Sequence, residues 1–490
     1  MLYIRLLQKR KNKMILNEKY SGLFTDHYEL TMAQGYFIDG RHNLNACFDY
    51  FFRKNPFGSG YTIFAGLQDL LEIISDFKFE DKAIDHLNRI GFKSDFLEYL
   101  KSFRFKGNIF APKEGEVVFS GEPIVRFEGN IIETQLIESV SLNVLNFQSL
   151  IATKASRLRH SAGDRVVIDF GMRRAQGMSA VHGSRAAVVG GVDSTSNVYS
   201  AYSYGMTSTG TMAHSWIQSY DNELEAFRKF AHSFPQNCVL LVDTFDTLSS
   251  GVPNAITVAK EMEKKGQKLL AVRLDSGDLA YLSKRARAML NTAELDYVKI
   301  VASNQLDEYL IKSLIEQGAP IDVFGVGTSL ITGQKDAALD GVYKLSMADG
   351  RPNLKLSEDF EKITLPGVKK IYRYFNGNGN FYADGIILND EDDPDKIFHP
   401  LQPLKSSEVK DRKKEVLQSK VYSEETIQYE RRSVQEISEY VKERLNRLPE
   451  EHKRFENPHI YKVGISSKLM NLRNEIVTEI TEKHKKGVNK

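Results

Sequence analysis

Seven short β-rich segments between residues 166 and 328 are each followed by polar side chains that could do chemistry. One such ending is commonplace, because strands often end in turns rich in Asp, Ser and Gly. Seven in series, with arginines and a histidine among them, indicate a ligand-binding rim. In chain order the residues are Asp169, Arg173 and Arg174; Asp193, Ser194 and Thr195; Thr211 and His214; Asp243, Thr244 and Asp246; Arg273, Asp275, Ser276 and Asp278; Ser303 and Asn304; Gly325, Gly327 and Thr328.

Two features of this rim suit phosphate and its metal ion. The segment GVGTSLITG resembles a phosphate cradle, since Gly325 and Gly327 let the backbone approach a ligand and Thr328 adds a hydroxyl donor. Carboxylates at Asp243, Asp275 and Asp278 could bind Mg²⁺ or hold ribose hydroxyls. The plainer alternatives are an ordinary turn for the glycine loop and strand-end capping for each aspartate.

Arg273 and His214 carry the sharpest alternatives. Arg273 lies inside the apolar run LLAVRLDSG, where a charge needs a partner or a ligand. It either pairs internally with Asp275 or recognises a planar anion, which the guanidinium fork suits. His214 has no Cys or second His at metal-ligand spacing nearby, so zinc is not indicated. The role of His214 is therefore either structural or catalytic.

The elements that must position these residues are alternating strands and helices. Strand-then-helix units in series predict a parallel sheet, and six or seven of them favour an α/β barrel over a doubly wound sheet. In a barrel the site lies where the strands end. We predict an α/β barrel over residues 151–345, an N-terminal β-rich and helical domain over 1–150, and a C-terminal segment over 346–490 that ends in a charged helical tail.

Composition narrows the function classes. The 66 basic and 64 acidic residues nearly cancel, which gives no support to a nucleic-acid-binding surface. Two cysteines cannot form a disulfide framework and suit a reducing compartment. We find neither a signal peptide nor a membrane span, so we expect a cytoplasmic protein. The basic start reads as a frayed leader, and Met14 could be the true start.

Seven longer motifs carry a resemblance to a known family. In chain order they are TDHYELTMAQGYF, FFRKNPFGSGYTIFAGL, DFGMRRAQG, GTMAHSWIQSY, LLVDTFDT, VRLDSGDL and VFGVGTSLIT, spread from about residue 24 to about residue 332. Together they resemble nicotinate phosphoribosyltransferase. The resemblance implies an irregular α/β barrel plus a β-rich domain built from N- and C-terminal segments, and a homodimer with shared active sites. It also implies transfer of phosphoribose from phosphoribosyl pyrophosphate to nicotinate, coupled to ATP hydrolysis through a phosphohistidine, as a salvage route to NAD.

The same resemblance assigns roles by motif. His214 matches the phosphorylated histidine. Thr211, Arg273 and Tyr28 match nicotinate contacts, with Tyr28 supplied by the partner subunit. The resemblance assigns five residues to binding of phosphoribosyl pyrophosphate and Mg²⁺: Arg174, Asp243, Asp275, Gly327 and Thr328. The resemblance does not define the metal ligands themselves.

Three alternatives remain. A nicotinamide-specific relative shares the barrel and the arginine motif, and residues around Asp193 and Ser215 are expected to discriminate the two pyridines. A non-catalytic sensor of nucleotides or phosphosugars could use the same barrel. An aldolase is disfavoured, because no strand-end lysine suits a Schiff base.

Overall fold

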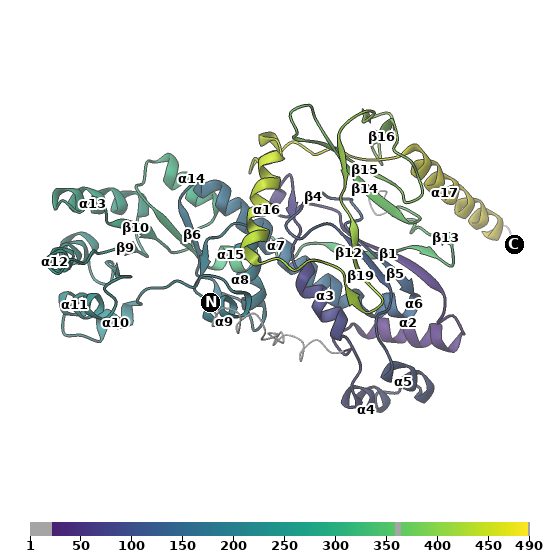
Figure 1. Cartoon of the computed structure of the whole chain (residues 1–490), viewed down its shortest axis with the longest axis horizontal. Coiled ribbons are helices and arrows are strands. Elements are labelled where there is room, and N and C mark those ends of the chain that lie inside the picture. Colours follow the sequence, from purple (N-terminus) through teal and green to yellow (C-terminus); the bar gives the residue numbers. More distant parts are fainter. Residues whose placement is uncertain (1–21, 358–363, 489–490) are drawn as a thin grey trace, which may run out of the picture. The chain divides into compact units, whose positions relative to one another are not determined.

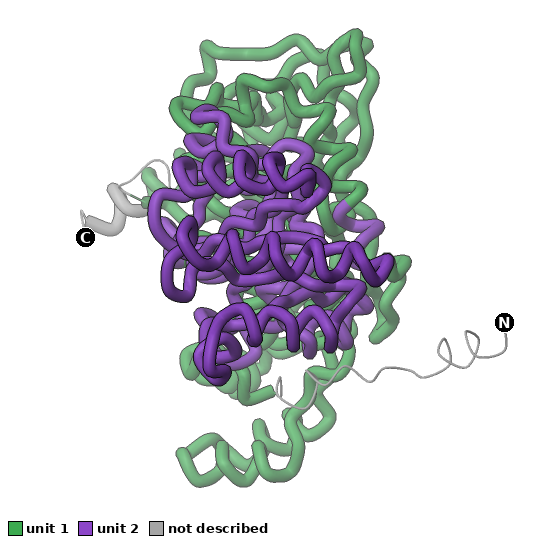
Figure 2. The backbone as a smooth tube through the Cα atoms, turned by 90° about the vertical axis from the view of Figure 1, so that its left-hand side faces the viewer, with its two compact units in different colours: residues 1–150, 338–432, 439–490 green, residues 151–337, 433–438 purple. Residues whose placement is uncertain are grey.

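The computed structural model of the chain describes residues 22–357 and 364–488, and these form two compact units (Figure 2). Unit 1 comprises the described residues up to 150, with 338–432 and from 439 onward. Unit 2 comprises 151–337 and 433–438. The basic start of the chain, with Met14, lies outside the described residues.

Unit 2 is built on a parallel sheet whose strand order follows the chain around a circle. Among the described residues the sheet has six strands in the order β7-β6-β11-β10-β9-β8, so the first strand, β6, pairs with the last, β11. A doubly wound sheet would instead reverse its order at a switch point. The strands are β6 (Val166–Asp169), β7 (Ser194–Thr195), β8 (Val239–Leu241), β9 (Ala271–Leu274), β10 (Lys299–Ala302) and β11 (Val323–Val326).

The circle of strands is interrupted between β7 and β8. Among the described residues no strand ladder joins these two, so the barrel is not closed. The intervening chain partly fills the opening: the Thr209 backbone N–H donates to the Thr195 carbonyl at 2.9 Å, and the Thr211 hydroxyl donates to the Val239 carbonyl at 2.7 Å. The fold is therefore α/β with an irregular, barrel-like strand order.

Two of the seven expected strand segments fold differently. The first half of the run AAVVGGVD, up to Val189, lies in helix α8, where its small and branched residues are all buried rather than alternating. TGTMAHS forms no strand and leads into helix α10. Asp193 consequently precedes β7, although we expected it after a strand.

Helices follow most strands of unit 2 (Figure 1). Their caps are encoded locally. The side chains of Asn222, Asp278 and Asp307 each accept a backbone N–H three residues on, which satisfies an otherwise orphan donor. The helices are α8 (Ser179–Val189), α9 (Val198–Tyr204), α10 (His214–Gln218), α11 (Glu223–Ser233), α12 (Val252–Glu263), α13 (Leu279–Thr292), α14 (Glu308–Glu316) and α15 (Thr328–Ile331).

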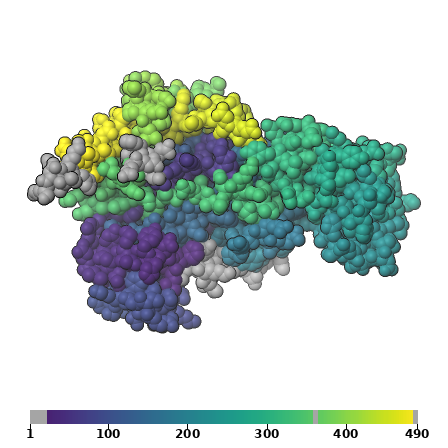
Figure 3. Space-filling view, turned by 180° about the vertical axis from the view of Figure 1, so that it is seen from behind, coloured from purple at the N-terminus to yellow at the C-terminus, as the bar shows by residue number. Residues whose placement is uncertain are grey.

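Unit 1 is β-rich and contains both ends of the chain, as predicted. In its largest sheet the N-terminal strand β1 pairs on one side with β5 and on the other with the late strand β12, both antiparallel. Purple N-terminal residues and green residues from late in the chain consequently lie against one another in Figure 3. This sheet contains β13 (Arg351–Pro352), β12 (Gly341–Ala348), β1 (Asn45–Phe52), β5 (Val125–Asn130), β3 (Asn108–Ala111), β19 (Ser419–Ser423) and β20 (Thr426–Ile427).

A second sheet and a two-stranded pair complete the β structure described in unit 1. The second sheet contains β17 (Ser406–Glu408), β16 (Lys396–Phe398), β21 (Val463–Ile465), β15 (Phe381–Leu388), β14 (Lys369–Phe375) and β18 (Lys414–Val416). The pair is β2 (Thr62–Ile63) with β4 (Val117–Val118). The remaining helices are α2 (His27–Ile38), α3 (Leu67–Asp76), α4 (Asp81–Arg89), α5 (Ser94–Lys101), α6 (Ile131–Leu136), α7 (Glu138–Ala162), α16 (Val434–Arg447) and α17 (Ser467–Val488); unit boundaries fall within α7 and α16.

None of the helices in the described ranges is long and apolar enough to cross a membrane. Cys47 and Cys238 are both buried free thiols.

Candidate active site

Along the parallel strands of unit 2, a layer of apolar side chains is followed, toward the strand ends, by a layer that includes polar and charged side chains. Ala271, Val301 and Val323 form one buried cluster across β9, β10 and β11, and Ile168 of β6 packs against it. Side chains two residues apart along a strand share a face. The next layer on that face, toward the strand ends, therefore contains Arg273, Ser303, Gly325 and Phe170.

Arg273 is the centre of this layer. Its Nε donates to the Ser303 hydroxyl at 3.0 Å, its Nη1 donates to the Met212 carbonyl at 3.3 Å, and its Nη2 lies 3.2 Å from Asp275 Oδ1. The guanidinium also faces the Phe170 ring, with 5.6 Å between Cζ and the ring centroid. The internal pair with Asp275 is thus real, and it fixes the arginine in place.

These contacts do not use all the hydrogen-bond donors of Arg273. A guanidinium carries five N–H donors, one on Nε and two on each terminal nitrogen. The three contacts above use one donor on each nitrogen, which leaves one on each terminal nitrogen. Two adjacent donors are what a carboxylate needs for bidentate recognition. Internal pairing and anion recognition are therefore compatible.

Asp275, which pairs with the arginine, also links it to Asp243 and His214. Asp243 Oδ2 accepts hydrogen bonds from the Asp275 N–H at 2.8 Å and the Ser276 hydroxyl at 2.6 Å. His214 Nε2 lies 3.9 Å from Asp275 Oδ2, and its Nδ1 is hydrogen-bonded with the Thr244 hydroxyl at 3.0 Å. The His214 side chain is 41% exposed, so the ring is open to a ligand. We call Arg273, Asp275, Ser303, Asp243 and His214 the strand-end cluster.

Gly325 lies inside β11 and has a different role from the phosphate cradle expected of it. A Cβ built on Gly325 would lie 2.5 Å from the Phe170 ring, whereas one on Gly327 would meet only the Phe170 carbonyl, at 3.5 Å. The absence of a side chain at Gly325 therefore accommodates a ring rather than a phosphate. Gly327 and exposed Thr328 follow at the end of β11, on the same edge of the parallel sheet as Arg273.

Other predicted residues have local structural partners. Asp278 caps the start of helix α13, and Asp246 caps the short helical turn over Thr247–Gly251. The Thr211 hydroxyl donates a hydrogen bond to the Val239 carbonyl of β8. Arg174 is exposed at the end of a short 3₁₀ turn (Met172–Arg174). Asp193 Oδ2 pairs with Arg159 at 2.8 Å and accepts the Val167 N–H at 2.8 Å, near the start of β6. That carboxylate is engaged at the strand starts, which argues against its expected role in pyridine selection.

Asp169 organises the turn that carries Phe170. It is fully buried, and it accepts from the Gly171 N–H and from the hydroxyls of Ser184 and Thr195, each at 2.7 Å. Burial raises the pKa of this carboxyl. Three donors on one carboxylate fix the chain between β6 and the following helix.

Tyr28 lies in unit 1, on the first turn of α2, and its side chain is exposed. Its hydroxyl is nonetheless partly buried, and this burial and the neighbouring Glu138 carboxylate raise the pKa of the hydroxyl. Beneath it Glu29 is fully buried, and its Oε1 accepts from the Ser139 hydroxyl at 2.6 Å. Burial raises the pKa of Glu29 to about 7.

The Glu29 carboxyl predicts a pH-dependent stability. Because its folded-state pKa is raised, its contribution is fully present at low pH and is lost as the pH rises from about 4.5 to about 7. We expect Glu29→Gln to flatten the fall in the free energy of unfolding over this window, by about 3 kcal/mol at most. Denaturant unfolding at several pH values checks this, with exposed Glu98→Gln as control. An unchanged pH profile in Glu29→Gln would contradict it.

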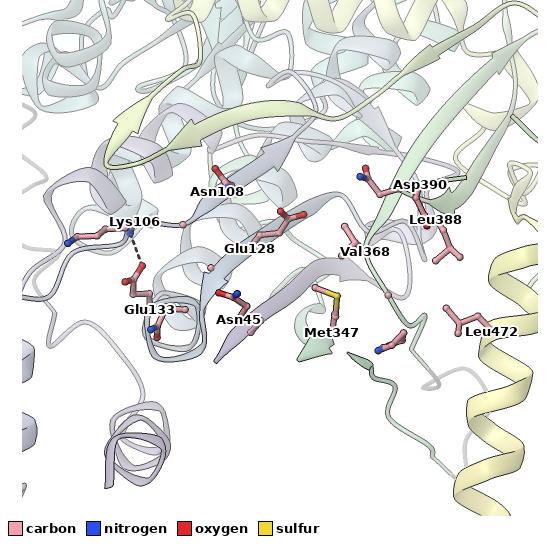
Figure 4. Close-up of a pocket in the computed structure, with 17 residues that line it drawn as sticks. Asn45, Lys106, Asn108, Glu128, Glu133, Met347, Val368, Leu388, Asp390 and Leu472 are labelled. Carbon is pink, nitrogen blue, oxygen red and sulfur yellow. Dashed lines mark hydrogen bonds between the residues drawn. The ribbon is translucent and has the colours of Figure 1, made fainter. Parts of the chain in front are cut away.

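None of the nine predicted site residues lines the cavity found in unit 1. Its volume is about 830 Å³, and Asn45, Asn108, Glu128, Leu388 and Leu472 are among the residues that line it (Figure 4). At its edge the Lys106 backbone N–H donates to Glu133 at 2.8 Å. The lining mixes apolar, amide and acidic groups with one lysine, Lys106, and contains no arginine or histidine. We place the chemistry at the strand-end cluster, because side-chain convergence is more specific than cavity size.

Sequence reasoning missed Phe170 as a member of the site. Its signal was available: it follows Ile168 by two residues, so it continues the same strand face directly after β6. The contact with Arg273, however, depends on the pairing of β6 with β11, which the sequence does not reveal by local pattern.

The fold and cluster together define an α/β barrel-like protein with a cluster of charged side chains at its strand ends. Comparison with known proteins is more specific. Three profiles match the chain: the nicotinate phosphoribosyltransferase (NAPRTase) N-terminal domain over residues 23–146, the nicotinate phosphoribosyltransferase (NAPRTase) family over 166–378, and the nicotinate phosphoribosyltransferase C-terminal domain over 368–473.

Whole-length relatives agree with the profiles. The chain is 42% identical to a nicotinate phosphoribosyltransferase of Bacillus subtilis, covering 94% of this chain and 95% of that one. It is 36% identical to one of Dictyostelium discoideum, covering 95% and 90%. The crystal structure of human nicotinic acid phosphoribosyltransferase superposes with a TM-score of 0.83 at 28% identity, covering 92% and 99%. The chain belongs to the nicotinate phosphoribosyltransferase family.

Proposed function

We propose that this chain transfers the 5-phosphoribosyl group of phosphoribosyl pyrophosphate to the ring nitrogen of nicotinate, releasing pyrophosphate and nicotinate mononucleotide. The observation that carries the proposal is Arg273: it is held rigidly by three contacts and retains two donors on adjacent nitrogens. Those donors suit the carboxylate that distinguishes nicotinate from nicotinamide. Family membership supports the same activity.

The reaction asks for positioning more than for covalent chemistry. The pyridine nitrogen attacks the anomeric carbon while the bond to pyrophosphate breaks, and the lone pair needs no general base. When Arg273 binds the carboxylate, the pyridine is held in one plane and its nitrogen is aligned with the anomeric carbon. The entropy of orientation is then lost on binding rather than in the transition state, which supplies much of the rate enhancement. In this proposal the phosphoribosyl phosphate is held by Gly327 and Thr328, with Arg174 toward the pyrophosphate.

Mg²⁺ fits the proposed site as a metal brought with pyrophosphate. No group of three potential ligands occurs among the described residues, so the protein alone does not offer a metal cage. Asp243 Oδ1 is buried without a hydrogen-bond partner, and a carboxylate oxygen of that kind suits a hard cation. Asp243 and Asp275 would hold the ion together with pyrophosphate and water. When bound it would neutralise charge on the leaving group.

For His214 we propose phosphorylation by ATP. The γ-phosphoryl group would pass to an imidazole nitrogen with release of ADP, and water would later break the P–N bond. The added charge would lie beside Asp275 and among the donors of the strand ends, so it would change their affinity for substrate and product. The exposure of the ring and its bond with Thr244 support this role. Entry into NAD salvage and a homodimer in which Tyr28 serves the partner's site complete the proposal.

A product assay tests the activity. Purified protein is incubated with phosphoribosyl pyrophosphate, Mg²⁺ and either nicotinate or nicotinamide, with and without ATP. We expect nicotinate mononucleotide, formed faster with ATP, and far less product from nicotinamide. Preference for nicotinamide would favour the nicotinamide-specific alternative. Binding of the substrates without any product would favour a sensor and refute the enzyme.

A further inference from the structure

Phe170 is wedged between a glycine and the arginine of the strand-end cluster. A Cβ on Gly325 would lie 2.5 Å from two atoms of the Phe170 ring, a separation that forces something to move. The Arg273 guanidinium carbon lies 5.6 Å from the centroid of the same ring. The ring therefore occupies the space that a side chain at position 325 would fill, and it borders the guanidinium.

The backbone around Phe170 leaves little freedom to relieve such a clash. The Phe170 N–H donates to the Val326 carbonyl at 2.8 Å, and the next N–H, of Gly171, donates to buried Asp169 at 2.7 Å. A Cβ on Gly171 would itself lie 2.4 Å from Ile331, so the turn is closely packed on that side as well. Extra volume at position 325 would consequently be taken up by rotation of the Phe170 ring.

Rotation of the ring would reach the arginine. The Arg273 side chain is only 14% exposed. Ser303 accepts a hydrogen bond from Arg273 and donates one to Asp275, and Asp275 forms an ion pair with Arg273. A guanidinium recognises a carboxylate through two parallel N–H bonds in its own plane, so a tilt of that plane weakens both bonds. Overpacking typically costs about 1–3 kcal/mol when the neighbours must leave their preferred rotamers.

We propose that Gly325 is a positioning residue that determines specificity for the pyridine carboxylate: its missing side chain seats Phe170, and Phe170 in turn sets the plane of the Arg273 guanidinium. This inference rests on the proposed function and deepens it. It separates two roles along this segment: Gly325, inside β11, accommodates the ring, and Gly327 and Thr328, after β11, make the proposed phosphate contacts.

The test begins with Gly325→Ala in the full-length protein. We expect the KM for nicotinate to rise about tenfold and the preference for nicotinate over nicotinamide to fall by a similar factor. The KM for phosphoribosyl pyrophosphate and the kcat should each change less than about threefold, because the substitution does not displace Gly327 and Thr328, which are proposed to hold the phosphate, or Arg174, proposed to face the pyrophosphate. Gly377→Ala is the matched control, because a Cβ there meets nothing within 4 Å.

A second background separates this mechanism from a general loss of packing. Phe170→Leu removes the ring that the new Cβ would strike, so Gly325→Ala in that background should fold and should add no further change in nicotinate KM. This comparison also decides the matter if Gly325→Ala alone does not fold. An equal rise in KM in both backgrounds would overturn the inference, as would a folded Gly325→Ala variant with unchanged nicotinate KM and preference. Absence of product from the wild-type protein would instead overturn the proposed function, and the inference with it.

Discussion

Arg273→Gln is expected to lower kcat/KM for nicotinate by about 10²- to 10⁴-fold. The change removes two charge-assisted hydrogen bonds to the pyridine carboxylate, each contributing about 1.5–3 kcal/mol, and a loss of 3–6 kcal/mol corresponds to that factor. Activity with nicotinamide, which has no carboxylate, should fall much less. Steady-state kinetics with both pyridines measure the effect directly.

The kinetic loss in Arg273→Gln reports recognition of the carboxylate only if the variant still folds. Arg273 also contacts Ser303 and Asp275, so its removal leaves Asp275 without its cation. Thermal unfolding of the variant therefore accompanies the kinetics. Arg228→Gln is the matched control, since Arg228 is a solvent-exposed arginine of the same unit that pairs with Glu261 on the helix surface. Equal losses with both pyridines would indicate that Arg273 supports the site without reading the carboxylate.

His214→Ala should abolish the stimulation by ATP and leave slow, ATP-independent transfer. In the proposed mechanism the imidazole accepts the phosphoryl group, and no other step requires it. The basal rate should therefore stay within about threefold of the wild-type rate measured without ATP. Initial rates with and without ATP, together with labelling by γ-phosphate-labelled ATP, give both quantities.

His232→Ala serves as the control for His214. His232 is exposed near the end of α11 in the same unit, and it has no place in the strand-end cluster. ATP stimulation and labelling should both persist in that variant. Stimulation that persisted in His214→Ala would show that ATP acts elsewhere, and the phosphohistidine would have to be abandoned.

Much of unit 2 could be predicted from the chain because its strands are buried on both faces. Such strands are continuous apolar runs, and CVLLVD, LLAVRLD and KIVAS each contain one of the observed strands. AAVVGGVD misled for the same reason: a fully buried helix is also apolar throughout, and periodicity alone cannot separate the two. Burial, rather than intrinsic propensity, decided that segment.

The site was predictable in its residue types but only partly in its geometry. The position of Arg273 in an apolar run predicted a partnered charge, and both the pairing with Asp275 and the bond to Ser303 are local to adjacent strands. The seat of Phe170 on Gly325 was not predictable, since it needs the first strand to pair with the last. Likewise Asp193 looked like a strand-end residue until α8 replaced the expected strand.

The most direct test of the central claim is a crystal structure of the protein with nicotinate mononucleotide bound. The account predicts that the pyridine carboxylate contacts the two unused donors of Arg273 and that the phosphate lies at Gly327 and Thr328. A nucleotide bound with its carboxylate in solvent, or seated in the cavity of unit 1 instead, would contradict the account.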